Sequence, residues 1–229
     1  MQDNLKILAF NTATKTLSLA LVQGEKLLHS YQSAETRDQG NILLEHAGQA
    51  LTAAGLAYTD IDAFAVVTGP GSFTGIRLGL ATARGLGLAT GKPVLGFSSF
   101  DMFAAPAHDK VNIVAVESWR RELYFAVLDE EGHALIACGN EAPEDFAARL
   151  KAELPGEYPF VISGDAAATL APLLPQAEVS SRGGDAADVA KLAAARLRAG
   201  GTFPEPLPYY LRPADITPSK RQEKTLKSN

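Results

Sequence analysis

Residues 66–79 read VVTGPGSFTGIRLG and place a strand end, a glycine-rich turn and a helix start within one short stretch. The run from 61 to 68 is apolar on both faces, which is typical of a strand buried in the middle of a sheet. The glycines and the proline indicate a turn whose backbone conformations are closed to most residues. We expect Ser72 or Thr74 to cap the following helix with its hydroxyl group.

That helix is predicted over residues 75–90 and carries small residues on one face. Gly75, Gly79, Ala83 and Gly87 recur at every fourth position, so they lie on the same side of the helix. Each glycine inside a helix costs about 1 kcal/mol relative to alanine. We therefore expect close packing against this face, by the protein's own sheet, by a helix of another molecule or by a ligand.

The rest of the chain predicts the same order of elements twice. In the first half, strands are expected over 5–10, 17–22, 26–32, 61–68 and 93–97, and helices over 41–56, 75–90 and from 98 to about 105. In the second half, strands are expected over 111–116, 122–128, 133–137 and 160–163, and helices over 143–152, 166–174 and 185–199. This order predicts an α/β fold with a duplicated βββαβα plan.

The duplication divides the chain into two predicted lobes. We expect an N-terminal lobe over residues 1–107, a more degraded C-terminal lobe over 108–213, and a cleft or hinge near 105–110. Residues 214–229 are polar and basic, which predicts a disordered tail that either solubilises the protein or contacts RNA.

Composition sets limits on the class of protein. The chain has 229 residues, is 46 % hydrophobic and carries a formal net charge of −5, which is typical of a globular protein without a strong affinity for nucleic acid of its own. A single cysteine, Cys138, excludes an internal disulfide. Neither a signal-peptide pattern nor an apolar run of ~18 residues is present, so we expect a cytoplasmic protein with no membrane partner.

The glycine turn is a candidate phosphate site. Backbone N–H groups at a helix start attract anions, which makes Gly69, Gly71 and Ser72 candidates. However, no Lys-Ser/Thr follows the glycines as in a Walker loop, and the glycine spacing misses the dinucleotide fingerprint by one residue. Pro70 also removes one N–H donor.

Two further loops are candidates for nucleotide or metal handling. Asn11, Thr12 and Thr14 follow the first strand, where a phosphate-and-metal loop would lie in a nucleotide-binding fold of this type. Asn11 is neutral, whereas Mg²⁺ prefers a carboxylate, and a turn with local hydroxyl hydrogen bonds is the alternative. Glu117 ends the matching strand of the second half, where it is either functional or paired with Arg120 or Arg121 at the surface.

The sequence predicts no catalytic set. The four histidines are scattered without a His-x-x-x-His pair, so we expect no metal site. Ser72 lacks the Gly-x-Ser-x-Gly elbow of serine hydrolases. The residues alone therefore favour a binding protein over an enzyme.

Several motifs resemble one protein family. Residues 69–79, GPGSFTGIRLG, resemble the signature of the TsaB (YeaZ) family of tRNA threonylcarbamoyladenosine biosynthesis proteins. The segments ILAFNTAT at 7–14, ELY at 122–124 and PYYLR at 208–212 are similar to the family's opening strand, its mid-chain Glu-Val-Tyr and its closing Pro-x-Tyr-Leu-Arg. The resemblance implies an actin- and sugar-kinase-like fold of two lobes.

The resemblance also implies a function and partners. It implies a non-catalytic subunit that forms a heterodimer with the catalytic paralogue TsaD and works with the ATPase TsaE. Their product is N6-threonylcarbamoyladenosine, next to the anticodon of tRNAs that read codons beginning with A. It further implies a homodimer when the subunit is alone, and tRNA contact only within the complex.

Three departures from the family bear on nucleotide chemistry. Asn11 stands where the family usually has Asp, Glu117-Ser118-Trp119 stands where Asp-Ala-Arg is common, and residues 37–39 lack a frequent histidine. We therefore expect no intrinsic cofactor, and ATP only with low affinity or at the interface of the complex.

The helices over 41–56 and 75–90 are the predicted partner surface. The candidate contacts are Leu44, Ala47, Leu51, Gly75, Gly79, Ala83 and Gly87. The alternative is that this face packs on the protein's own sheet. The alternative function is a stand-alone ATPase or a glycoprotease-like peptidase, which would need a ligand at Asn11, Thr12 and the glycine turn.

Overall fold

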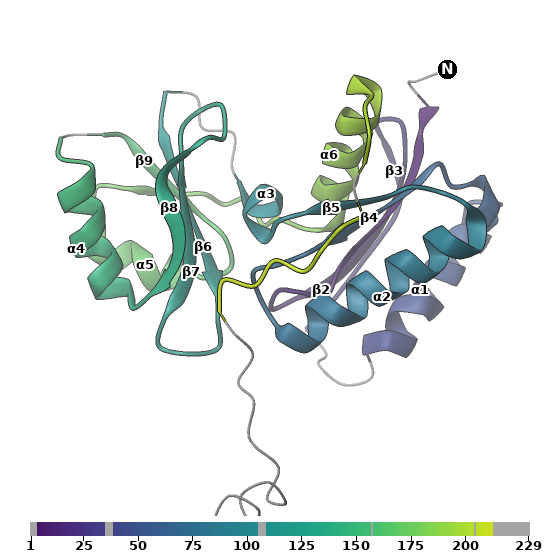
Figure 1. Ribbon diagram of the computed structural model, residues 1–229, viewed down its shortest axis with the longest axis horizontal. Helices are drawn as coiled ribbons and strands as arrows, with labels where there is room; N and C mark the ends of the chain where they lie inside the picture. Colours follow the sequence, from purple (N-terminus) through teal and green to yellow (C-terminus); the bar gives the residue numbers. More distant parts are fainter. Residues whose placement is uncertain (1–3, 35–38, 105–108, 157, 204, 213–229) are drawn as a thin grey trace, which may run out of the picture.

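The computed structural model describes residues 4–34, 39–104, 109–156, 158–203 and 205–212. The chain forms two lobes, each built on a five-stranded mixed sheet (Figure 1). The predicted tail over 214–229, and most of the predicted hinge near 105–110, lie outside the described residues.

The first sheet has the strand order β3-β2-β1-β4-β5. β1, β2 and β3 form an antiparallel meander, and β4 and β5 run parallel to β1. The bounds are β1 Lys6–Asn11, β2 Leu17–Gln23, β3 Lys26–Ser33, β4 Ala63–Val67 and β5 Val94–Phe97. Every residue of β4 is buried, as expected for an apolar strand that has a neighbour on each side.

Helices cover both faces of this sheet (Figure 1). α1 (Gln39–Ala53) and α2 (Phe73–Thr90) lie on one face and α6 (Ala186–Ala199) on the other. A short 3-10 turn at Tyr58–Asp60 precedes β4, and α3 (Ser99–Phe103) lies between the lobes.

The second sheet repeats the plan with the order β10-β9-β6-β7-β8. The bounds are β6 Val111–Glu117, β7 Leu123–Leu128, β8 Ala134–Glu141, β9 Phe160–Ser163 and β10 Glu178–Val179. α4 (Pro143–Glu153) and α5 (Ala167–Leu170) pack on its outer face (Figure 1), around a core that includes Phe125, Phe146 and Ile162. The duplicated βββαβα plan is confirmed.

Some element bounds differ from the predicted ones. α2 begins at Phe73, two residues early, because Ser72 caps it, and its end is confirmed by Gly91 in the left-handed conformation (φ 67°). The helix predicted over 166–174 is instead the short α5 followed by a 3-10 turn at Ala171–Leu173, because Pro172 cannot donate a helical hydrogen bond. β8 is longer than predicted, and β10 and the 3-10 turn at Tyr58–Asp60 were not predicted.

The packing of α6 differs from the predicted division into residues 1–107 and 108–213. α6 lies against β1 and β2 of the first sheet, and its buried Val189, Ala190 and Ala193 belong to the first lobe's core. The periodicity of a helix marks an apolar face but does not say which sheet that face covers. Among the described residues, no helix is long and apolar enough to cross a bilayer.

Candidate functional site

In the loop after β1, the side chain of Asn11 is already bonded within the chain. Asn11 is buried, and its Nδ2 donates to Thr14 Oγ1 at 2.7 Å and to the Thr16 carbonyl at 3.1 Å. Its Oδ1 accepts from the Ala13 N–H at 3.0 Å. The side chain therefore fixes the turn itself, as in the local hydrogen-bond alternative.

The glycine turn lies directly against this loop. Thr12 Oγ1 donates to the Gly75 carbonyl at 2.6 Å, and the Ser72 N–H donates to the Ala13 carbonyl at 2.7 Å. A Cβ atom added to Gly71 would lie 2.1 Å from the Ala13 oxygen, and one added to Gly75 would lie 1.9 Å from the Thr12 oxygen. The glycines thus allow two backbone segments to meet, and the Ser72 N–H is already used.

Gly69 anchors the turn on its other side. The Ser99 N–H donates to the Gly69 carbonyl and Ser99 Oγ donates to the Pro70 carbonyl, both at 2.7 Å. Gly69 has a φ of 112°, a conformation that side-chain-bearing residues rarely adopt. The structure therefore brings six of the predicted loop residues together as a packed joint, while Glu117 lies at the end of β6 in the other lobe.

Glu117 shapes the loop that follows it. Its Oε1 accepts from the N–H groups of Ser118 at 3.0 Å and Trp119 at 2.8 Å. Of the two predicted partners Arg120 and Arg121, Arg121 instead lies 3.9 Å from Glu144. The carboxylate therefore orients the β6–β7 loop.

Asp165 joins the two lobes and was missed in the sequence. Its Oδ1 accepts from the Glu117 N–H at 2.8 Å, and its Oδ2 accepts from the Lys15 N–H at 3.2 Å. Asp165 follows β9 in the second lobe, just as the glycine turn follows β4 in the first. The duplicated order of elements could therefore have identified Asp165 as a candidate. Burial raises the pKa of the Asp165 carboxyl, although the N–H groups of Glu117 and Lys15 act to lower it.

This raised pKa predicts a pH dependence of stability. The folded state keeps the proton to a higher pH than the unfolded state, whose Asp pKa is about 3.9. The contribution of Asp165 to stability is therefore fully present below that pH and is lost as pH rises through the folded pKa. As pH rises from the unfolded pKa through the folded pKa of Asp165, we expect the free energy of unfolding of the unmodified chain to fall relative to that of Asp165→Asn. Urea denaturation of both chains from about pH 3.5 to 7 measures it, and a difference that stays flat or grows with pH would contradict it.

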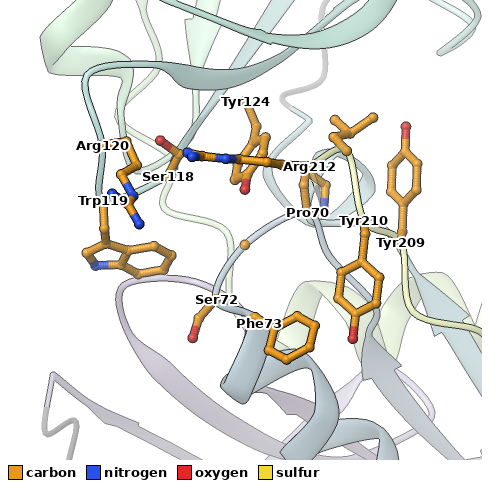
Figure 2. Close-up of a pocket in the computed structure, with 12 residues that line it drawn as sticks. Pro70, Ser72, Phe73, Ser118, Trp119, Arg120, Tyr124, Tyr209, Tyr210 and Arg212 are labelled. Carbon is orange, nitrogen blue, oxygen red and sulfur yellow. The ribbon is translucent and has the colours of Figure 1, made fainter. Parts of the chain in front are cut away.

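A cleft of about 390 Å³ opens between the lobes beside the glycine turn (Figure 2). Three segments line it with Tyr124: the turn at 70–73, the β6–β7 loop at 118–120, and residues 209–212. The last belong to the C-terminal strap, defined here as residues 205–212, which runs between the lobes (Figure 1). The strap is held by the Tyr209 N–H, which donates to the Thr68 carbonyl at 2.8 Å, and by Arg84, which lies 3.0 Å from Glu205.

The predicted partner face of α1 and α2 is wrong for six of its seven residues. Ala47, Leu51, Gly75, Gly79, Ala83 and Gly87 are all buried. A Cβ atom on Gly79 would lie 2.6 Å from Thr12 Oγ1, and one on Gly87 would lie 2.5 Å from a methyl group of Val94. This face therefore packs on the protein's own sheet and loop, which was the alternative. Leu44 alone is exposed.

The opposite side of α2 is apolar and open, and together with Leu44 of α1 it forms a surface that, apart from Leu44, was not predicted. This outer face consists of Leu44 on α1 and Ala81, Gly85, Leu88 and Ala89 on α2, all exposed. The Leu88 side chain is 88 % exposed, and a Cβ atom on Gly85 would meet nothing within 4 Å. The small residues Ala81, Gly85 and Ala89 also recur at every fourth position, and this spacing could have predicted the outer face from the sequence.

The outer face of α2 also lacks charge. α2 contains no acidic residue, and its two charged residues are Arg77 and Arg84. Both contact the strap, Arg77 through the Tyr210 hydroxyl and Arg84 through Glu205. Solvent-facing helix surfaces normally carry charged side chains, so this uncharged face is suited to contact with another protein.

Among the described residues, one group of side chains has the spacing of metal ligands. Asp129, Glu131 and His133 lie on the turn between β7 and β8. Asp129 accepts from the His133 N–H at 2.7 Å, so the group has a structural role in the turn.

Two βββαβα lobes that face each other across a cleft define the α/β class of actin- and sugar-kinase-like proteins. The family model described as TsaD, tRNA N6-adenosine threonylcarbamoyltransferase, matches residues 34–202. "tRNA threonylcarbamoyladenosine biosynthesis protein TsaB" of Escherichia coli is 31 % identical over 165 residues, 70 % of this chain and 69 % of the relative. The chain belongs to the TsaB (YeaZ) branch of this family.

Two further similarities agree with this assignment. The TsaB protein of Haemophilus influenzae is 33 % identical over 133 residues, and the match spans just over half of each protein, 56 %. The solved structure of YeaZ from Pseudomonas aeruginosa superposes with a TM-score of 0.70 at 26 % identity, over 90 % of this chain and 100 % of that one.

Proposed function

We propose that this chain is the non-catalytic partner subunit of a TsaD-containing complex. The complex forms N6-threonylcarbamoyladenosine next to the anticodon of tRNAs that read codons beginning with A. TsaD is the proposed heterodimer partner and TsaE a further component, and tRNA contacts the chain only within the assembly. Because the substrate is tRNA, we place the complex in the cytoplasm.

The observation that carries this proposal is the uncharged outer face of α2, together with the exposed Leu44 of α1. Leu88, Gly85 and Ala81 form an exposed surface that leaves room for another backbone. Small residues let helices approach closely, and a protruding leucine can fill a pocket of the partner. The same face suits a homodimer when the chain is alone, so the two assemblies would compete.

The packed joint at the glycine turn supports a role without catalysis. Asn11, Thr12 and the Ser72 N–H are bonded within the chain, in the place where the alternative ATPase or peptidase would need free ligands. We therefore propose that the chain alone binds no cofactor and that any ATP bound by the complex is held mainly by its partners.

Reconstitution of the modification tests the proposed function. TsaD, TsaE and the remaining components are incubated with an unmodified tRNA, ATP and threonine, with and without this chain, and the modified nucleoside is quantified by mass spectrometry. We expect product only when the chain is present. Equal product without it would overturn the proposed role.

Calorimetry separates the proposal from the ATPase alternative. We expect no saturable heat when Mg-ATP is titrated into the isolated chain, because the Thr12 hydroxyl is bound to the Gly75 carbonyl. Tight binding with turnover that is lost in Thr12→Val, but kept in the exposed control Thr74→Val, would show instead that the chain is an enzyme.

A further inference from the structure

Two leucines protrude from the surface of the described residues more than any other large apolar side chain. Leu88 on α2 is 88 % exposed and Leu207 on the strap is 70 % exposed, whereas the next, Trp119, is 49 % exposed. A single exposed leucine is ordinary on a protein surface. A continuous apolar patch instead marks an interaction site, so the position of the two leucines relative to each other is decisive.

Arg84 connects the two leucines. It lies four residues before Leu88 on α2, so the two side chains are neighbours on the helix surface. Arg84 Nε lies 3.0 Å from Glu205 Oε1, and Arg84 Nη2 donates to the Pro206 carbonyl at 2.5 Å. Glu205 and Pro206 directly precede Leu207, so the leucine of the strap lies beside α2.

The strap turns Leu207 toward the same side as Glu205. Both residues precede a proline, which favours an extended backbone. Pro206 between them faces β5, because a Cβ atom added to Gly96 would lie 2.6 Å from the Pro206 Cβ. Successive residues of an extended chain point to opposite sides, so Glu205 and Leu207 both point away from β5. Leu207 therefore extends the outer face across the Arg84–Glu205 pair.

A groove of about 500 Å³ adjoins Leu207 at the edge of the first sheet, and its apolar walls include Leu95 and Phe203. The charged residues that line it are Glu205 and Arg196. Glu205 is paired with α2, and Arg196 Nη1 donates to a backbone carbonyl of β5 at 3.2 Å. The groove therefore offers apolar surface beside charges that are already engaged within the chain.

These features suit an uncharged protein surface as the occupant. Nucleic acid would need unpaired basic side chains to hold its phosphates, whereas Arg84 and Glu205 neutralise each other. A stable heterodimer buries roughly 800 Å² on each partner, and the small side chains of Ala81, Gly85 and Ala89 contribute little of that area. The strap supplies further apolar surface directly beside α2.

We propose that the protein that docks on α2 also covers the strap, where Leu207 is a second anchor and the groove beside it receives an apolar side chain of that protein. This inference rests on the proposed function, because it assigns the surface to the same partner, TsaD. The Arg84–Glu205 pair is then buried in the complex, between the two leucines. Loss of one member of the pair leaves the other charge unpaired in the interface, which costs affinity.

Isothermal titration calorimetry of the full chain with TsaD tests the second anchor. Leu207→Asp is expected to lose affinity about tenfold, because it places a carboxylate against an apolar surface. Leu27→Asp is the matched control, since Leu27 is also exposed but lies on β3, at the opposite edge of the first sheet. Its affinity is expected to stay within about twofold, and both variants are expected to keep the melting temperature of the unmodified chain.

Removal of the ion pair tests its burial in the complex. Glu205→Gln is expected to weaken TsaD binding about fivefold or more, because the Arg84 charge then has no partner inside the interface. Glu25→Gln breaks a comparable pair, in which Arg198 Nη2 lies 3.2 Å from Glu25 Oε1 at the turn between β2 and β3. This control is expected to leave the affinity within about twofold, since an exposed pair outside the interface contributes little.

Three outcomes would overturn the second anchor. Equal affinity of Leu207→Asp and Leu27→Asp for TsaD would do so, and it would leave the partner role intact if Leu88→Glu still loses binding. A change in the self-association of Leu207→Asp, with unchanged affinity for TsaD, would assign the groove to a second copy of the chain. An unmodified chain that does not bind TsaD at all would overturn the proposed function together with this inference.

Discussion

Gly75→Ala is expected to destabilise the chain severely, whereas Gly85→Ala on the same helix is expected to stabilise it. At position 75 the new methyl group would lie 1.9 Å from the Thr12 carbonyl oxygen, so α2 must move away from the loop. That movement breaks the buried hydrogen bond from Thr12 Oγ1 to the Gly75 carbonyl. Overpacking and the lost bond together cost on the order of 3 kcal/mol or more.

At position 85 the same substitution meets open space. A Cβ atom there has no neighbour within 4 Å, so only the helix propensity changes, by about 1 kcal/mol in favour of alanine. Guanidinium denaturation of the isolated chains, followed by circular dichroism, gives both free energies. If both variants unfold within about 0.5 kcal/mol of the unmodified chain, the inward orientation of the Gly75 face is incorrect.

Because this face of α2 is buried, two substitutions on it would measure folding and not partner binding. Gly79→Trp and Ala83→Arg, placed on the face first predicted to meet a partner, are expected to disrupt folding. Ala83 is fully buried, and a Cβ atom on Gly79 would lie 3.2 Å from a methyl group of Val66. Loss of a complex in these variants would therefore say nothing about the partner surface.

Local signals in the sequence predicted the fold well. The glycine turn, the Ser72 cap and the helix end at residue 90 depend on residues within a few positions of one another, and all three are confirmed. The order of elements revealed the duplication because each lobe repeats the same short-range patterns. Family motifs such as GPGSFTGIRLG further predicted that this duplicated fold belongs to the actin- and sugar-kinase-like class.

Features that depend on contacts between residues far apart in the chain could not be predicted from the sequence. α2 carries small residues on two faces, and the inner one is set by contact with the loop at Thr12, far away in the chain. The cleft likewise joins segments around residues 72, 119 and 210, so no local pattern indicates Trp119 or Tyr210 as neighbours. The membership of α6 in the first lobe depends on packing in the same way.

Leu88→Glu is expected to abolish complex formation with TsaD while leaving the chain folded. The side chain is 88 % exposed, so the change costs the isolated chain less than about 0.5 kcal/mol. In a docked interface it would bury an unpaired carboxylate and remove a central apolar contact. Hot-spot losses exceed about 2 kcal/mol, which corresponds to roughly 25-fold or more in affinity.

Leu135→Glu is the matched control for this substitution. Leu135 is 43 % exposed on β8 of the other lobe, away from the outer face of α1 and α2. The same new charge there is expected to leave affinity for TsaD within about twofold, since residues outside an interface contribute little. Gly85→Arg is a second variant on the outer face and should act like Leu88→Glu.

The most direct measurement is sedimentation velocity of this chain mixed with TsaD, at a protein concentration near the dissociation constant of the unmodified pair. We predict a heterodimer peak for the unmodified chain and for Leu135→Glu and none for Leu88→Glu and Gly85→Arg, while no variant has a free energy of unfolding more than about 0.5 kcal/mol below that of the unmodified chain. An intact heterodimer in both outer-face variants would contradict the assignment of this surface to the partner.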